Sequence, residues 1–221
     1  MTDSFATTLE LVHRATQSTV QTVDGLADNE WAKPSVLPGW SRAHVVAHLT
    51  NHALGTSRAI HGLRNHQPTP IYDSNEARDL GIDHFATRPP SQLRERFLAS
   101  VTAVYDALRH LTPDLRAETV QRTPGGQLIA GDELVLMRWR EVEIHHADLD
   151  AGFTHRDWSP EFVDYLLPIV KLDRAEEVDL DRVHGAPASL AWWLAGRGNG
   201  EGLLGELPSL GPWTRRPTPV K

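Results

Sequence analysis

The chain has 221 residues, a formal net charge of −7 and a 40% share of hydrophobic residues, an ordinary composition for a globular protein. The acidic balance argues against binding to nucleic acid or anionic membranes, and no apolar run reaches the roughly 20 residues that span a bilayer. Because the N-terminus also lacks a signal-peptide pattern, we expect a cytoplasmic monomer or homodimer without a membrane or nucleic-acid partner.

Apolar residues that recur at intervals near 3.6 predict four long amphipathic helices in the first part of the chain. Ser41 and Asp132 are suited to cap the second and fourth of them. A short helix is expected between the second and third, and residues 123–133 are expected to be a turn-rich link. The four helices are predicted over residues 5–26, 42–64, 91–111 and 132–149.

The pattern changes after residue 150. A helix is predicted around residues 162–170, followed by a strand and turn over residues 176–185. Pro187 and Gly196 then mark the start and end of another helix, and the proline-rich residues 206–221 are expected to end in extended structure.

These elements predict an α+β fold with two domains. Residues 1–150 would form a four-helix bundle, and residues 151–221 would form a small α/β domain packed against it. The predicted inter-domain core includes Trp192 and Trp193.

Cysteine is absent from the chain, whereas histidine occurs 12 times. Without cysteine the protein has no disulfide, no thiolate metal site and no cysteine nucleophile. A transition-metal site would therefore use imidazole and carboxylate groups, and any thiol chemistry would need a small-molecule thiol.

Ionisable residues occupy the stripe of the fourth predicted helix that should be apolar. Glu141, His145 and Asp148 follow the spacing i, i+4, i+7 and so lie within about 60° of one another around the helix. His146 points about 100° away from His145 and is not expected to belong to the group. Buried ionisable groups need a partner, so this stripe indicates a site.

The second predicted helix carries histidines at every fourth position: His44, His48 and His52. One of them, together with Glu141 and His145, would supply three ligands to a catalytic zinc and leave a position open. Asp148, or less favourably Asp150, would orient a ligand imidazole.

Other interpretations of these residues remain open. The histidine triplet can be a solvated face, His48 can be a buried histidine with ordinary partners, and Glu141 can pair with Arg138 or Arg140. Near the C-terminus, Arg197 follows a predicted helix and precedes glycines. It can either cap helix carbonyls or bind a substrate carboxylate with its guanidinium fork.

Four segments resemble the mycothiol-dependent maleylpyruvate isomerase family of the DinB-like metalloenzyme superfamily. They occur in the same order as in that family and span nearly the whole chain. They are LPGWSRAHVVAHL (37–49), NEARDLGIDHFATRPPSQL (75–93), RWREVEIHHADLDAG (138–152) and LAWWLAGRGNGEGL (190–203).

The resemblance implies a DinB-like four-helix bundle followed by a small α/β domain. It also implies a divalent metal, usually zinc, bound by His48, Glu141 and His145, and it implies a catalytic role for Arg197. The cofactor would be mycothiol, and the substrate a small carboxylate.

The implied reaction converts maleylpyruvate to fumarylpyruvate in the breakdown of gentisate. The thiol would add to the double bond, the resulting single bond would rotate, and the thiol would leave. Two alternatives are a metal-dependent mycothiol S-transferase, which consumes the thiol, and a metal-binding or ligand-binding module without catalysis.

Overall fold

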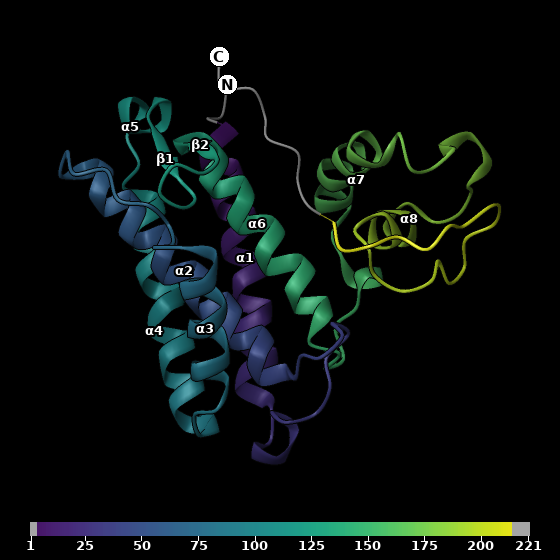
Figure 1. The fold of residues 1–221 in the computed structure, drawn as a ribbon, viewed down its shortest axis with the longest axis horizontal. Coiled ribbons are helices and arrows are strands. Elements are labelled where there is room, and N and C mark those ends of the chain that lie inside the picture. Colours follow the sequence, from purple (N-terminus) through teal and green to yellow (C-terminus); the bar gives the residue numbers. More distant parts are fainter. Residues whose placement is uncertain (1–3, 214–221) are drawn as a thin grey trace.

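The computed structural model describes residues 4–213, and its main body is a bundle of four long helices (Figure 1). All four correspond to helices predicted from the sequence, so that prediction is confirmed. The four long helices are α1 (Ser4–Gly25), α2 (Arg42–Arg64), α4 (Pro90–Arg109) and α6 (Gly131–Asp148). A short 3-10 helix, η1 (Asp28–Glu30), follows α1.

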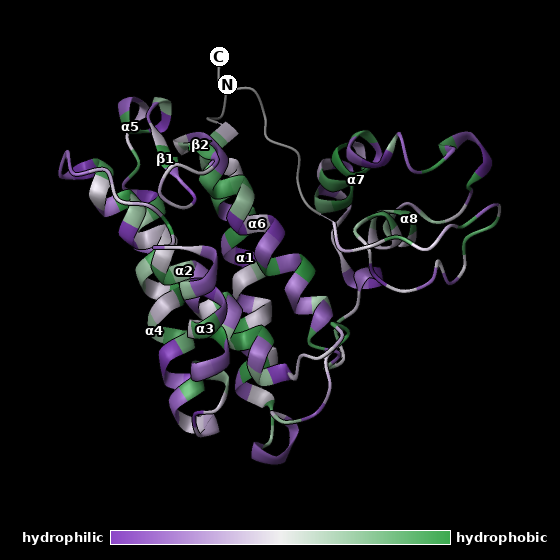
Figure 2. Ribbon diagram, viewed as in Figure 1, coloured by the Kyte–Doolittle hydropathy of each residue, from purple (hydrophilic) through white to green (hydrophobic). Residues whose placement is uncertain are grey.

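The bundle is held together by apolar stripes that face its interior, and apolar and polar residues alternate around its helices in Figure 2. In α4 the buried apolar residues recur every three to four positions, and each is at most 9% exposed: Leu93, Phe97, Val101, Val104 and Leu108. Burying a side chain of this size contributes about 1.5–3 kcal/mol. The spacing read from the sequence therefore determines which face of each helix is buried.

Short elements connect the long helices. The predicted short helix is α3 (Asn75–Ala86), capped by Ser74, whose Oγ accepts the N–H of Ala77 at 2.9 Å; it packs on α2. A one-turn helix, α5 (Pro113–Ala117), precedes an antiparallel pair of strands, β1 (Thr119–Gln121) and β2 (Leu128–Ala130). The prediction of a turn-rich link missed β2, because a three-residue strand is too short to show alternation.

The segment after α2 returns across that helix and then pairs with the hairpin. The backbone N–H groups of Ile71 and Tyr72 donate to the carbonyls of Gln121 and Arg122 at 3.0 and 2.9 Å. The close crossing needs a glycine, since a Cβ on Gly55 would lie 2.5 Å from the Ile71 carbonyl oxygen. Tyr72 is thereby fixed beside α2.

The chain beyond α6 forms a smaller helical part. It contains η2 (His155–Asp157), α7 (Pro160–Arg174), η3 (Leu180–Arg182) and α8 (Pro187–Leu194). The strand predicted over residues 176–185 was wrong: the structure has η3 there and a single antiparallel bridge between His184 and Leu204. Residues 206–213 contain no helix or strand, and the rest of the predicted extended end lies outside the described residues.

The fold class is α+β, as predicted, and within residues 4–213 the paired strands lie between α5 and α6. The smaller part packs through aromatic residues. Trp192 and Trp193 are 8% and 2% exposed and belong to the same buried cluster as residues of α6 and α7, which agrees with their predicted place. None of the described helices has the length and apolar character needed to cross a membrane.

Candidate functional site

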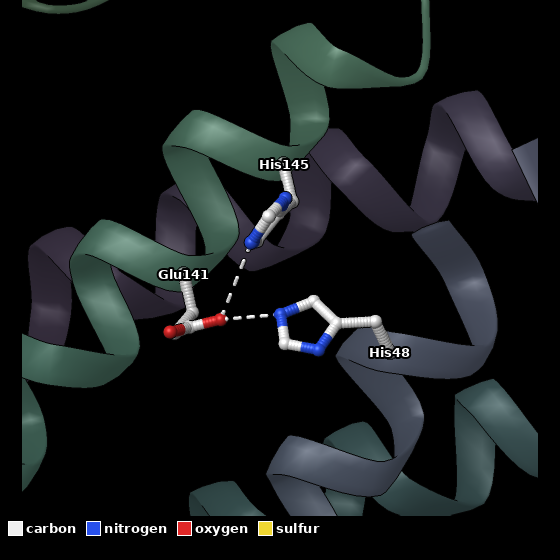
Figure 3. A group of neighbouring side chains, drawn as sticks. All are labelled: His48, Glu141 and His145. Atoms are coloured by element: carbon white, nitrogen blue, oxygen red, sulfur yellow. Dashed lines mark hydrogen bonds and ion pairs between the residues drawn. The ribbon is translucent and has the colours of Figure 1, made fainter. Parts of the chain in front are cut away.

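Three side chains from two helices point toward one another (Figure 3). His48 lies on α2, whereas Glu141 and His145 lie one turn apart on α6. Nε2 of His48 is 2.8 Å from Oε2 of Glu141, and Nε2 of His145 is 3.5 Å from the same oxygen. One nitrogen or oxygen atom of each residue lies within 4.8 Å of the other two. The three residues predicted as a group are therefore neighbours in space.

The group is closed on the α2 side and partly open on the α6 side. His48 is 4% exposed, while the side chains of Glu141 and His145 keep exposures of 25% and 14%. The rings of His48 and His145 meet edge to face, with centroids 4.4 Å apart. The solvent-exposed part of the group therefore belongs to the two α6 residues, whereas the imidazole of His48 is buried.

Burial sets the protonation of the group. Burial and repulsion by His145 lower the pKa of His48 to about 4, so its imidazole is neutral at pH 7. Burial alone would raise the pKa of Glu141, but the adjacent His52 and His48 outweigh it and hold that pKa well below the usual value. A neutral imidazole and an ionised carboxylate are the forms that bind a metal ion.

Asp148 supports His145 from the other side of its ring. It is fully buried, and its Oδ2 lies 2.8 Å from Nδ1 of His145. Burial alone would raise the pKa of Asp148, but Arg197 and His145 keep it below the usual value. A carboxylate beside the second ring nitrogen is the usual environment of a metal-binding histidine. The closeness of Asp148 to an imidazole of the group, expected from the sequence, is present at His145.

Arg197 reaches the same carboxylate from the segment after α8. Its Nε and Nη2 donate to Oδ1 and Oδ2 of Asp148 at 3.3 and 3.1 Å, and its Nη1 donates to the Ala195 carbonyl at 2.7 Å. Its side chain is 11% exposed. The guanidinium thus binds a protein carboxylate and also caps a helix carbonyl, so all three of its nitrogens have an acceptor.

The other two histidines of α2 have different surroundings. His52 is 3% exposed, and its Nε2 lies 4.0 Å from Oε1 of Glu141 and has no hydrogen-bond partner among the described residues. Burial lowers the pKa of His52 to about 3. His44 instead accepts the backbone N–H of Ser41 at 3.2 Å, where Ser41 caps α2 as predicted.

The two arginines considered as ion-pair partners of Glu141 bind other groups. Arg140 pairs with Glu133 at 2.9 Å, and Arg138 donates to the Leu49 carbonyl at 3.2 Å. His146, predicted to lie off the group, lies 2.7 Å from the Thr22 hydroxyl on α1. Glu141 is thus left facing imidazoles.

Two residues beside His48, and a third beside Arg78, did not emerge from the sequence pattern. Nη2 of Arg78 on α3 lies 3.2 Å from Nδ1 of His48, and the Trp40 ring lies 5.7 Å from the His48 ring. The Tyr72 ring lies 5.9 Å from the Arg78 guanidinium. Burial raises the pKa of Tyr72 to about 12, so it remains a neutral phenol. The only sequence signal for Arg78 and Trp40 was their place within segments that resemble the family.

The geometry suits a divalent metal ion. Two imidazoles and one carboxylate are a frequent ligand set for catalytic zinc, and such sites keep a further position for water or substrate. The three side chains come from facing helices of a bundle, an arrangement that bundle metal sites use. The partly exposed side of the group leaves access for a further ligand.

Comparisons with known proteins identify the family and the fold of the chain. Residues 12–150 match the family model described as "Mycothiol maleylpyruvate isomerase N-terminal domain". A crystal structure of a mycothiol-dependent maleylpyruvate isomerase is 26% identical, with a TM-score of 0.85 over 96% of this chain and 98% of that chain. A histidine-to-alanine mutant of such an isomerase is 25% identical, with the same TM-score and coverage.

No curated protein matches the sequence. The family model nevertheless covers more than half of the chain, and the structural likeness extends through the C-terminal part. The chain therefore belongs to the mycothiol maleylpyruvate isomerase family, as its sequence segments suggested.

Proposed function

We propose that this protein is a cis–trans isomerase that converts maleylpyruvate to fumarylpyruvate with mycothiol as its thiol cofactor. The observation that carries the proposal is the convergence of His48, Glu141 and His145 in a member of this family. The absence of cysteine supports an external thiol. The solved structures with the same fold are described as mycothiol-dependent maleylpyruvate isomerases, which supports this substrate and this thiol.

His48, Glu141 and His145 would hold a divalent metal ion, which we propose to be zinc. The neutral state of His48, the ionised state of Glu141 and the carboxylate behind His145 all favour cation binding. When bound, the ion would supply positive charge that lowers the pKa of a thiol or polarises a carbonyl oxygen.

The thiol supplies a nucleophile whose reversible addition converts a double bond into a single bond that can rotate. The protein's own residues orient this chemistry. Asp148 favours the tautomer of His145 whose Nδ1 carries the proton, so that Nε2 faces His48 and Glu141 with a free lone pair. Trp40 covers His48 at the edge of the site.

The contacts of Arg197 support a positioning role. By holding the buried carboxylate of Asp148 at two points, Arg197 fixes the group that contacts His145. The predicted direct contact between Arg197 and a substrate carboxylate remains a prediction, and it would require Asp148 to give up part of its pair.

We further propose that the chain divides functionally at residue 150. Residues 1–150 would form the metal-binding bundle, and residues 151–221 would form a smaller unit that supplies Arg197. The Asp148–Arg197 pair supports this division, because it joins the end of α6 to the segment after α8.

The test combines metal analysis with a maleylpyruvate assay in the presence and absence of mycothiol. We expect one metal ion per chain and thiol-dependent isomerisation in the wild type, and neither in His48→Ala or His145→Ala. His61→Ala is the matched control, since His61 is an exposed histidine on the same helix. Isomerisation that persists in metal-free His48→Ala would disprove the proposal.

Measuring how much mycothiol is consumed during turnover distinguishes an isomerase from an S-transferase. An isomerase regenerates mycothiol, whereas an S-transferase consumes one molecule for each molecule of product. A protein that binds zinc but converts no cis-enedioate in the presence of thiol would instead be a binding module.

A further inference from the structure

A cavity of about 290 Å³ lies between α2, α3 and residues 71–73. Its lining includes two arginines, Arg58 from α2 and Arg78 from α3, together with the Asn51 amide and Tyr72. A volume of this size is near the lower end for small-molecule pockets. The cavity therefore combines the dimensions of a small ligand with two cationic side chains.

Arg78 connects this cavity to the group formed by His48, Glu141 and His145. Arg78 lines the cavity, and its Nη2 is 3.2 Å from Nδ1 of His48. Its side chain keeps 21% of its exposure. A ligand bound to Arg78 would consequently lie next to the proposed metal-binding residues.

The present partners of Arg78 are easily exchanged. Nδ1 of His48 can accept an Arg78 N–H only while the ring proton is on Nε2. If Nε2 of His48 binds a metal, the ring proton is on Nδ1. The N–H of His48 Nδ1 and an N–H of Arg78 would then face each other, and the hydrogen bond between them would be lost. The carboxylate partner of Arg78 is Asp79, 63% exposed and 2.5 Å away, and exposed ion pairs of this kind contribute little to stability.

Arg58, which lines the same cavity, could also bind a ligand carboxylate. Its side chain is 44% exposed, and its carboxylate partner, Asp73, is 74% exposed at 3.1 Å. Two further contacts of its Nη2, with the carbonyls of Pro70 and Ile71, hold the guanidinium at the cavity wall. The lining of the cavity therefore offers a dicarboxylate two arginines.

Arg197 is less available for this task. All three of its nitrogens have protein acceptors, and its carboxylate partner is fully buried, unlike Asp79 or Asp73. Releasing Arg197 would leave Asp148 as a buried charge without its cation, which is costly.

We infer that the cavity between α2 and α3 is the carboxylate subsite of the protein, and that Arg78 binds the substrate carboxylate closest to the reacting double bond. Arg58 holds the second carboxylate of a dicarboxylic acid. The inference rests on the proposed isomerase function for the identity of the substrate, and it assigns the recognition of that substrate to α3 instead of to Arg197.

The experiment measures binding of maleate, an unreactive cis-dicarboxylate, by calorimetry to zinc-loaded and to metal-free protein. The variants are Arg78→Ala, Arg78→Lys and Arg58→Ala. Arg109→Ala is the control, because Arg109 is an exposed arginine at the end of α4. Zinc content and circular dichroism are recorded for each variant.

We expect Arg78→Ala to weaken maleate binding by about tenfold or more, the loss expected for a charge-assisted hydrogen-bond pair, with zinc content unchanged. Arg78→Lys should weaken maleate binding less than Arg78→Ala does. Arg58→Ala should weaken it several-fold, and Arg109→Ala should leave it unchanged. Wild-type protein should bind maleate more tightly with zinc than without it. In the isomerase assay, Arg78→Ala should raise KM by a similar factor and change kcat less.

Equal maleate affinity in wild type and Arg78→Ala would overturn the inference, as would a wild type that does not bind maleate. If Arg78→Ala fails to fold, Arg78→Lys and Arg58→Ala still test the subsite, and unchanged affinity in both refutes it. Failure of the proposed function looks different: the wild type would not isomerise maleylpyruvate with thiol, while maleate binding would still depend on Arg78.

Discussion

The guanidinium of Arg197 holds the buried carboxylate of Asp148 through two nitrogen–oxygen contacts of 3.3 and 3.1 Å. The two residues are 49 positions apart in the sequence, and Asp148 also contacts His145 at 2.8 Å. One ion pair therefore fastens the C-terminal part of the chain to the bundle and at the same time supports a proposed metal ligand.

The first prediction concerns the stability that this pair provides. Arg197→Ala leaves the carboxylate of Asp148 buried without its cation, and we expect the free energy of unfolding to fall by about 3–5 kcal/mol in urea titrations. The double variant Arg197→Ala/Asp148→Asn should recover part of the loss, because a neutral amide needs no cation. A single variant as stable as the wild type would contradict the structural account of the pair.

A second prediction concerns the contact between Asp148 and His145. Asp148→Asn keeps the side-chain volume but weakens the contact with Nδ1 of His145, so the zinc affinity should fall about 10–100-fold. Competition with a chromophoric chelator measures this affinity. Asp164→Asn, at an exposed position on α7, is the control and should bind zinc like the wild type.

The third prediction is a loss of stability in acid. Burial lowers the pKa of His146 from 6.5 to about 4, so the unfolded chain takes up a proton near pH 6.5 while the native protein does so only near pH 4. The free energy of unfolding should therefore fall as the pH drops from 6.5 to 4.

His146→Gln should reduce this pH-dependent loss by about 1–3 kcal/mol, measured by urea unfolding at pH 7 and pH 4.5 with EDTA present. His61→Gln, which changes an exposed histidine, should leave the pH dependence as it is. If both variants behave alike, burial of His146 is not the cause.

The fourth prediction is a loss of stability as the pH rises, opposite in direction to the effect of His146. Burial raises the pKa of Glu143 from 4.5 to about 7, so the native protein keeps a proton that the unfolded chain has already released. Between pH 4.5 and 7 the stability contributed by this group decreases as the pH rises. At pH 8, Glu143→Gln should be more stable than the wild type by about 1–3 kcal/mol, with little difference at pH 4. Thermal unfolding at the two pH values tests this.

The fifth prediction concerns the crossing of α2 by the segment that carries Tyr72. In Gly55→Ala the new Cβ would lie 2.5 Å from the Ile71 carbonyl oxygen, so this segment must shift, at an expected cost of about 1–3 kcal/mol. Gly25→Ala is the matched control, because a Cβ at that position meets no atom within 4 Å. Comparable unfolding midpoints for the two variants would show that the crossing tolerates a methyl group.

The long helices and the faces they bury were predictable from the sequence. Helical periodicity alone places Glu141, His145 and Asp148 on one side of α6 and His146 on another, because these angles depend only on the local rise and turn of the helix. The β1–β2 hairpin and η3 were not predictable, because strands of three residues and single turns give too little pattern to separate them from loops.

The sequence by itself determined which residue types could form a site: imidazoles and carboxylates in a chain without cysteine, arranged on two helix faces. Helix spacing left three histidines open, and the family resemblance pointed to His48, which lies 2.8 Å from Glu141. Only the tertiary structure showed that Asp148 pairs with Arg197 and that Arg78 lies beside His48. Spacing along one helix is a local property, whereas these partners are distant in the chain and meet only where α2, α3, α6 and the segment after α8 pack together.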